Sequence, residues 1–125
     1  MLFMKKDMSV AGTVLSLDYY VAKRKLKVPC DFYLALAENA ISEKATRPGD
    51  VHIARNGQSV EIHNTDAEGR LAMADALDVA VTQKGSHEPC EVIDVSTLTG
   101  AMRVSLGLDV AGFFSNSDDL ADDLE

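Results

Sequence analysis

The stretch EIHNTDAEGRLAMADAL, residues 61–77, places charged side chains on a short turn, where a strand-like run gives way to a helical one. Asp66 and Glu68 stand two residues apart, and Gly69 and Arg70 follow them directly. Carboxylate oxygens are ligands that hard and borderline divalent cations prefer. A guanidinium donates paired hydrogen bonds, which suits it to a carboxylate, a carbonate or a developing oxyanion. The stretch therefore predicts a strand–helix junction with candidate metal ligands.

The same turn also has a purely structural interpretation. Asn64, Thr65 and Asp66 are all residues that cap helix N-termini, because their side-chain oxygens accept backbone N–H bonds. Glu68 is well placed for the positive end of the helix dipole. Two nearby carboxylates repel each other unless a cation lies between them or one takes up a proton, but two are too few to define a metal site. The residues alone leave helix capping and metal binding open.

Helical and strand-like patterns alternate on both sides of this turn. Apolar residues at three- and four-residue spacing predict helices over residues 5–25 and 71–83. Asn56-Gly57, between two alternating runs, predicts a β-hairpin with a type I′ turn. The remaining apolar runs predict strands at residues 28–36, 90–95 and 110–117, and a further helix starts near residue 118.

This order predicts an α/β fold: a three-layer domain with a mostly parallel central sheet, one β-hairpin and helices on both faces. Ligands of open α/β sheets bind beyond the carboxyl ends of the strands. A second small-residue junction, STLTGA at residues 96–101, should share that rim with NTDAEGR. Because the chain opens and closes directly on helix-like patterns, we expect its 125 residues to be part of a longer protein.

Composition excludes some classes of partner. The net charge of −8 argues against nucleic acid and against an anionic membrane, which both need a basic face. No apolar run approaches the ~20 residues that span a bilayer, and the start has no apolar core of a secretory signal. Cys30 and Cys90 lie in strand-like contexts without C-x-x-C spacing. We predict reduced, buried cysteines in a reducing compartment, with a disulfide as the alternative.

Other chemically capable residues are isolated in the sequence. Asp7 alone is typical of a surface residue or salt-bridge partner. The three histidines, His52, His63 and His87, form no H-x-x-x-H pair. Neither a dinucleotide-binding glycine motif nor a phosphate-binding loop is present, so a nucleotide site is not predicted.

Several segments together resemble the cytosolic leucine aminopeptidases, a family of two-metal exopeptidases. NTDAEGR followed by the helical LAMADAL is similar to the family signature. MKKDM, at residues 4–8, resembles the segment that carries a metal-binding aspartate, and STLTGAM, at residues 96–102, resembles the substrate-cleft loop. The resemblance covers practically all 125 residues in order and without a large gap.

The resemblance implies an enzyme that releases N-terminal residues, with a leucine-type preference, by attack of water activated by two metals. It implies Asp7, Asp66 and Glu68 as metal ligands, with Glu68 bridging both ions. Zinc or manganese is expected, with magnesium or cobalt as substitutes. Arg70 resembles the catalytic arginine that holds a bicarbonate acting as general base. The substrate-binding residues that the resemblance implies are Met4, Asp7, Thr97, Leu98 and Gly100.

The resemblance also implies partners and a location. The substrates would be peptides with a free N-terminus, and the full-length protein would be a cytoplasmic homohexamer that uses neither nucleic acid nor membrane.

Departures from the family pattern concern the surroundings of the metals. The family carries two lysines and a further metal-binding aspartate upstream, and a separate N-terminal domain; none of these is found in residues 1–125. Ser9-Val10 replaces a pair of glycines, and Arg103 stands where the family has no large basic residue. We therefore expect residues 1–125 to be a partial catalytic domain that binds metal weakly and is inactive alone. The alternatives are a non-catalytic structural or binding module and, less favoured without a phosphate-cradling loop, a two-metal phosphoesterase.

Overall fold

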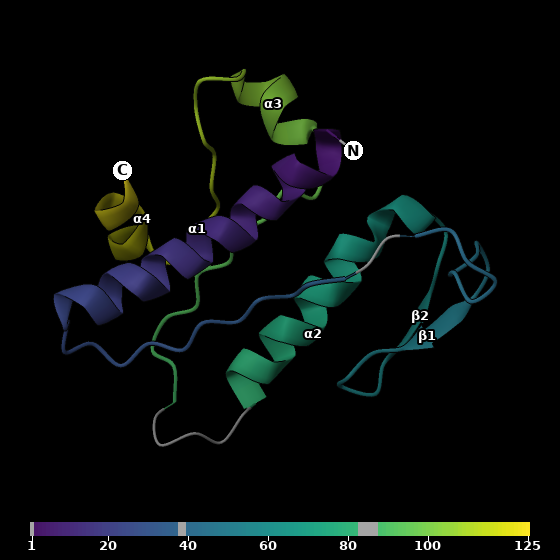
Figure 1. Ribbon diagram of the computed structural model, residues 1–125, viewed down its shortest axis with the longest axis horizontal. Helices are drawn as coiled ribbons and strands as arrows, with labels where there is room; N and C mark the ends of the chain where they lie inside the picture. Colours follow the sequence, from purple (N-terminus) through teal and green to yellow (C-terminus); the bar gives the residue numbers. More distant parts are fainter. Residues whose placement is uncertain (1, 38–39, 83–87) are drawn as a thin grey trace.

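The computed structural model describes residues 2–37, 40–82 and 88–125, with the backbone alone for residues 2–7. Figure 1 shows two long helices, α1 and α2, with a hairpin beside α2 and two short helices nearer to α1. The elements in chain order are α1 (Leu2–Arg24), β1 (Val51–Ile53), β2 (Ser59–Glu61), the 3₁₀ turn η1 (Thr65–Ala67), α2 (Glu68–Thr82), α3 (Ala101–Leu106) and α4 (Asp118–Leu124).

Helix α1 confirms the first predicted helix, and its end follows from local chemistry. Lys23 and Arg24 occupy the last turn, where the helix dipole favours cations. Lys25 then takes a left-handed conformation with φ 52°. The N–H groups of Lys25 and Leu26 donate to the carbonyls of Ala22 and Val21, both at 3.1 Å. This pair of bonds is a Schellman motif, which satisfies the last carbonyls of the helix and stops it.

The predicted hairpin is confirmed, but its predicted turn type is wrong. Strands β1 and β2 pair antiparallel, with His52 opposite Val60. Gly57 has φ +86°, whereas Lys25 is the only non-glycine residue with positive φ in the described ranges, so Asn56 does not take the left-handed conformation that a type I′ turn needs. The N–H of Gly57 donates to the Ala54 carbonyl at 2.8 Å. The loop is the three-residue kind with glycine at its left-handed position.

Hydrogen bonds beyond the two strands fasten the hairpin at its base. The N–H of Gly49 donates to the Ile62 carbonyl at 2.7 Å, and the N–H of Ile62 donates to the Asp50 carbonyl at 2.8 Å. The Ile62 side chain is 4% exposed and is the one buried apolar side chain in the described ranges. The chain therefore enters the turn at residues 64–67 from a fixed position.

The predicted parallel central sheet is not found among the described residues. The three segments predicted as its strands, residues 28–36, 90–95 and 110–117, are irregular, and the two-stranded hairpin is the sheet that the described ranges contain. A parallel strand needs a neighbour distant in sequence and helices over both faces, whereas a hairpin needs only adjacent chain. The structure is thus an α/β assembly of helices and one hairpin, without the three predicted layers.

The exposed surface area is large because the described ranges contain no central sheet on which the other segments could pack. The chain exposes 10985 Å², whereas a compact protein of this mass exposes about 6,500 Å². Cys30 and Cys90 are free, as predicted, but both are exposed rather than buried, because the segments that carry them pack against no sheet. Among the described helices, none combines the length and the apolar character needed to cross a bilayer.

Candidate metal centre

The turn at the start of α2 is shaped by a cap. Asn64 has extended backbone, with φ −137° and ψ 116°. Its side-chain oxygen accepts the N–H of Asp66 at 3.0 Å, and its carbonyl accepts the N–H of Ala67 at 3.3 Å. Of the three possible capping residues, Asn64 is the one whose side chain caps this turn. Capping and metal binding therefore do not compete for the same carboxylates.

Asp66 and Glu68 are left without capping bonds by this arrangement. Asp66 has φ −83° and ψ 15°, in the bridge region where many active-site residues lie, and it is exposed. Glu68 opens α2, and its Oε2 atom is buried and accepts no hydrogen bond within the described structure. A buried carboxylate oxygen without a donor carries a desolvation cost that a proton or a cation would offset.

The donor set fits a divalent cation in part. Asp66 and Glu68 supply carboxylate oxygens two residues apart, and the unpaired Glu68 Oε2 is the kind of atom that a hard cation would satisfy. Within the described ranges, no group of three or more His, Cys, Asp or Glu residues lies close enough to hold a metal. Asp7, the third predicted ligand, and Met4, predicted as pocket lining, lie in α1, but their side chains fall outside the described structure.

The second predicted junction meets the first at one contact. A Cβ placed on Gly69 would lie 3.2 Å from Cδ2 of Leu98, so the absence of a side chain at Gly69 lets the 96–101 loop come close to α2. Thr97 precedes Leu98, and Gly100 stands directly before α3, with φ −81° and ψ 2°. In the view of Figure 1, α3, the first turn of α2 and the N-terminal end of α1 lie toward the same side of the molecule. The two junctions therefore meet at Leu98 and Gly69, although the parallel sheet whose rim they were predicted to share is not found in the described ranges.

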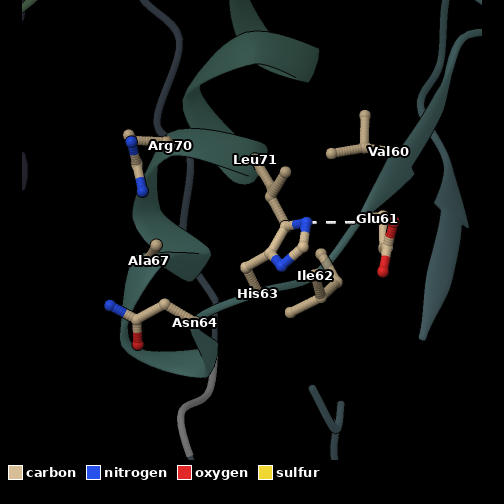
Figure 2. A pocket seen from close by; sticks show the side chains of 8 residues that line it. All are labelled: Val60, Glu61, Ile62, His63, Asn64, Ala67, Arg70 and Leu71. Carbon is tan, nitrogen blue, oxygen red and sulfur yellow. Dashed lines mark ion pairs between the residues drawn. The ribbon is translucent and has the colours of Figure 1, made fainter. Parts of the chain in front are cut away.

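A cavity of about 340 Å³ opens beside the turn. Figure 2 shows the side chains around it: Val60, Glu61, Ile62, His63, Asn64, Ala67, Arg70 and Leu71. His63 Nε2 lies 3.8 Å from Glu61 Oε2, and both side chains are mainly exposed. Arg70 lies on the first turn of α2 and is exposed, so its guanidinium is available to an anionic or carbonyl group. The cavity thus combines the Arg70 guanidinium, the Glu61 carboxylate beside His63 and a mostly apolar wall.

Two features near the site escaped the sequence interpretation. One is Arg55 in the hairpin loop, which contacts Asp75, Asp78 and Thr82 of α2. The only sequence pattern that pointed to such a contact was the spacing of these three polar residues on one face of the helix. The other is α3, for which no helix was predicted and which begins at the last residue of the STLTGA junction. Gly107, with φ +86°, ends that helix, and a glycine in this position is a common stop signal.

The chain matches the model of the cytosol aminopeptidase family, catalytic domain, over residues 1–125. It is 51% identical over 124 residues to a probable cytosol aminopeptidase of Chlamydia abortus, covering 99% of this chain and 24% of that relative. It is 48% identical over 118 residues to a cytosol aminopeptidase of Encephalitozoon cuniculi, covering 94% of this chain and 24% of that relative. No solved structure matches.

The chain spans about a quarter of the length of these curated relatives. The match extends over the whole chain and includes both the NTDAEGR turn and the STLTGA loop. The chain therefore belongs to the cytosol aminopeptidase family.

Proposed function

We propose that residues 1–125 are part of the catalytic domain of a metal-dependent aminopeptidase that releases N-terminal residues, with a leucine-type preference, from peptides. The observation that carries the proposal is the buried, unpaired Oε2 of Glu68 on the signature turn. Membership of the cytosol aminopeptidase family supports the reaction class. The full-length protein would work in the cytoplasm as a homohexamer, following the family resemblance.

Asp66 and Glu68 would hold two divalent ions, zinc or manganese, together with Asp7 from α1. When bound, these ions supply Lewis acidity to the substrate carbonyl and to the attacking water. Glu68 would bridge the two ions, since one of its oxygens is already free of protein partners. Asp7 would also receive the free α-amino group of the peptide, so the substrate would need an unblocked N-terminus.

Arg70 would hold a bicarbonate that takes a proton from the attacking water, because a guanidinium pairs with such an anion through two parallel hydrogen bonds. Leu98 would border the substrate cleft with Thr97 and Gly100, and its contact with Gly69 would set the distance between cleft and metals. Met4 would line the pocket for the first side chain of the peptide.

The test is hydrolysis by the full-length gene product. With added Mn²⁺ it should release the chromophore of leucine 4-nitroanilide and leave the N-acetylated compound intact. Absence of hydrolysis by a folded, metal-loaded protein would contradict the proposal. Equal hydrolysis of both compounds would remove the role given to Asp7.

A second candidate is a non-catalytic binding module. The observation in its favour is the extent of exposed surface, with Ile62 the single buried apolar side chain in the described ranges. The 125-residue chain should then show no hydrolysis by itself. The two candidates differ in the full-length gene product: an enzyme gains activity with Mn²⁺, and a module stays inactive.

A further inference from the structure

Arg55, at the tip of the hairpin loop, makes three contacts with α2. Its backbone N–H donates to Oδ1 of Asp75 at 2.9 Å. Its guanidinium donates to Oγ1 of Thr82 at 2.8 Å and forms an ion pair with Asp78. The Asp78 side chain is only 18% exposed, so this pair is better shielded from solvent than an ordinary surface pair. Figure 1 shows the hairpin lying beside α2.

These contacts close a loop that contains the candidate metal turn. From the hairpin tip, the chain runs through β2 and Ile62 into the turn at residues 64–67, and then into α2. The turn has two legs: the segment that enters it, which is β2 and Ile62, and the helix that leaves it, which is α2. The first leg is fixed by the pairing of β2 with β1 and by the hydrogen bonds of Ile62. The other leg is fixed because Arg55 anchors the middle and end of α2 to the hairpin. The angle between the two legs sets where Asp66 and Glu68 point.

The charges at this contact come from Arg55 and two acidic residues of α2. Asp75 and Asp78 lie three residues apart on one helix face, where like charges repel by a few tenths of a kcal/mol. The Arg55 guanidinium neutralises Asp78, and its backbone N–H stabilises Asp75. The two acids are therefore held by a single residue of the hairpin loop.

We propose that Arg55 is a positioning residue: by clamping the hairpin loop to Asp75, Asp78 and Thr82 of α2, it fixes the turn that presents Asp66 and Glu68. The role of these two carboxylates as ligands rests on the proposed function, whereas the geometry of the turn does not. Arg55 touches neither carboxylate in the described structure and acts only through the two legs.

The experiment compares Arg55→Ala and Arg55→Lys with Arg47→Ala. Arg47 lies just before the hairpin, and its side chain makes no hydrogen bond or ion pair in the described structure, which makes it a matched control. Amide hydrogen exchange is followed along the chain, and Mn²⁺ affinity is measured by titration calorimetry. Because partners that orient a ligand typically contribute 10–100-fold to metal affinity, Arg55→Ala should weaken Mn²⁺ binding about tenfold. Arg55→Lys, which keeps the charge, should recover part of that loss.

Exchange at residues 62–70 should accelerate in Arg55→Ala while exchange in α1 stays unchanged, and Arg47→Ala should resemble the parent. If Arg55→Ala does not fold, Thr82→Val removes one of the three Arg55 contacts, together with the bond that the Thr82 hydroxyl donates to the Asp78 carbonyl, and should give a smaller change of the same kind. Unchanged exchange at residues 62–70, or equal acceleration in α1, would overturn the proposal. A parent chain that binds no Mn²⁺ would contradict the proposed function instead, and the exchange pattern would still decide the role of Arg55.

Discussion

Cδ2 of Leu98 lies 3.2 Å from the position that a Cβ on Gly69 would occupy. The two junctions that define the candidate site therefore meet where one residue lacks a side chain. Gly69 lies in α2, where alanine is favoured over glycine by about 1 kcal/mol of helix propensity. In Gly69→Ala this gain should be offset by crowding of Leu98, so that the free energy of unfolding changes little.

Removing Leu98 should release that gain. In a Leu98→Ala background, Gly69→Ala should stabilise the chain by about 1 kcal/mol, which gives a coupling of at least ~0.5 kcal/mol between the two sites. Urea unfolding of the four proteins of this cycle measures the coupling. Additive effects would mean that the loop and the helix are not in contact in solution.

Asn64 should matter through its side-chain oxygen. Asn64→Ala removes the acceptor of the Asp66 N–H and should cost about 1 kcal/mol in the free energy of unfolding, whereas Asn64→Asp keeps an acceptor and should cost little. Thermal unfolding followed by circular dichroism compares the variants. Equal stability of Asn64→Ala and the parent would show that the cap contributes nothing to this turn.

Gly112 makes room for α3. A Cβ at this position would lie 2.7 Å from Cδ1 of Leu106 and 2.9 Å from Cε of Met102, and it would also clash with the Met102 sulfur. Gly112→Ala should therefore destabilise the chain by about 1 kcal/mol, the low end of the usual cost of overpacking, because the flexible ends of Met102 and Leu106 can move aside. Met102→Ala in the same chain should restore most of the loss in a denaturation experiment. A neutral Gly112→Ala would show that α3 does not pack on residue 112.

Structure that depends only on neighbouring residues was predictable from the sequence. The periodic apolar residues of α1 and α2 predicted both helices, and Asn56-Gly57 predicted the hairpin, because each element needs only adjacent chain. The turn type was wrong because Gly57 alone takes the left-handed conformation. The sequence offered three candidates for the residue that caps the turn before α2, and in the structure the capping side chain is that of Asn64.

Features that depend on distant residues were not predictable in the same way. The segment at residues 90–95 has the composition of a buried strand, but a strand forms only when a neighbour pairs with it. Arg55 looks like an ordinary turn residue until the fold places it against Asp78. Gly69 and Leu98 lie close together, but not for the predicted reason, because the parallel sheet whose edge the two junctions were expected to share is not found in the described ranges.

We propose above that the buried Oε2 of Glu68 belongs to a divalent metal site. Titration of Mn²⁺ into the parent chain, Glu68→Gln and Glu91→Gln tests it most directly, since Glu91 is an exposed glutamate distant in sequence from the turn. Glu68→Gln, which keeps the shape of the side chain but removes its charge, should lose at least about tenfold in Mn²⁺ affinity, while Glu91→Gln should bind like the parent. Equal Mn²⁺ affinity of Glu68→Gln and the parent would contradict it.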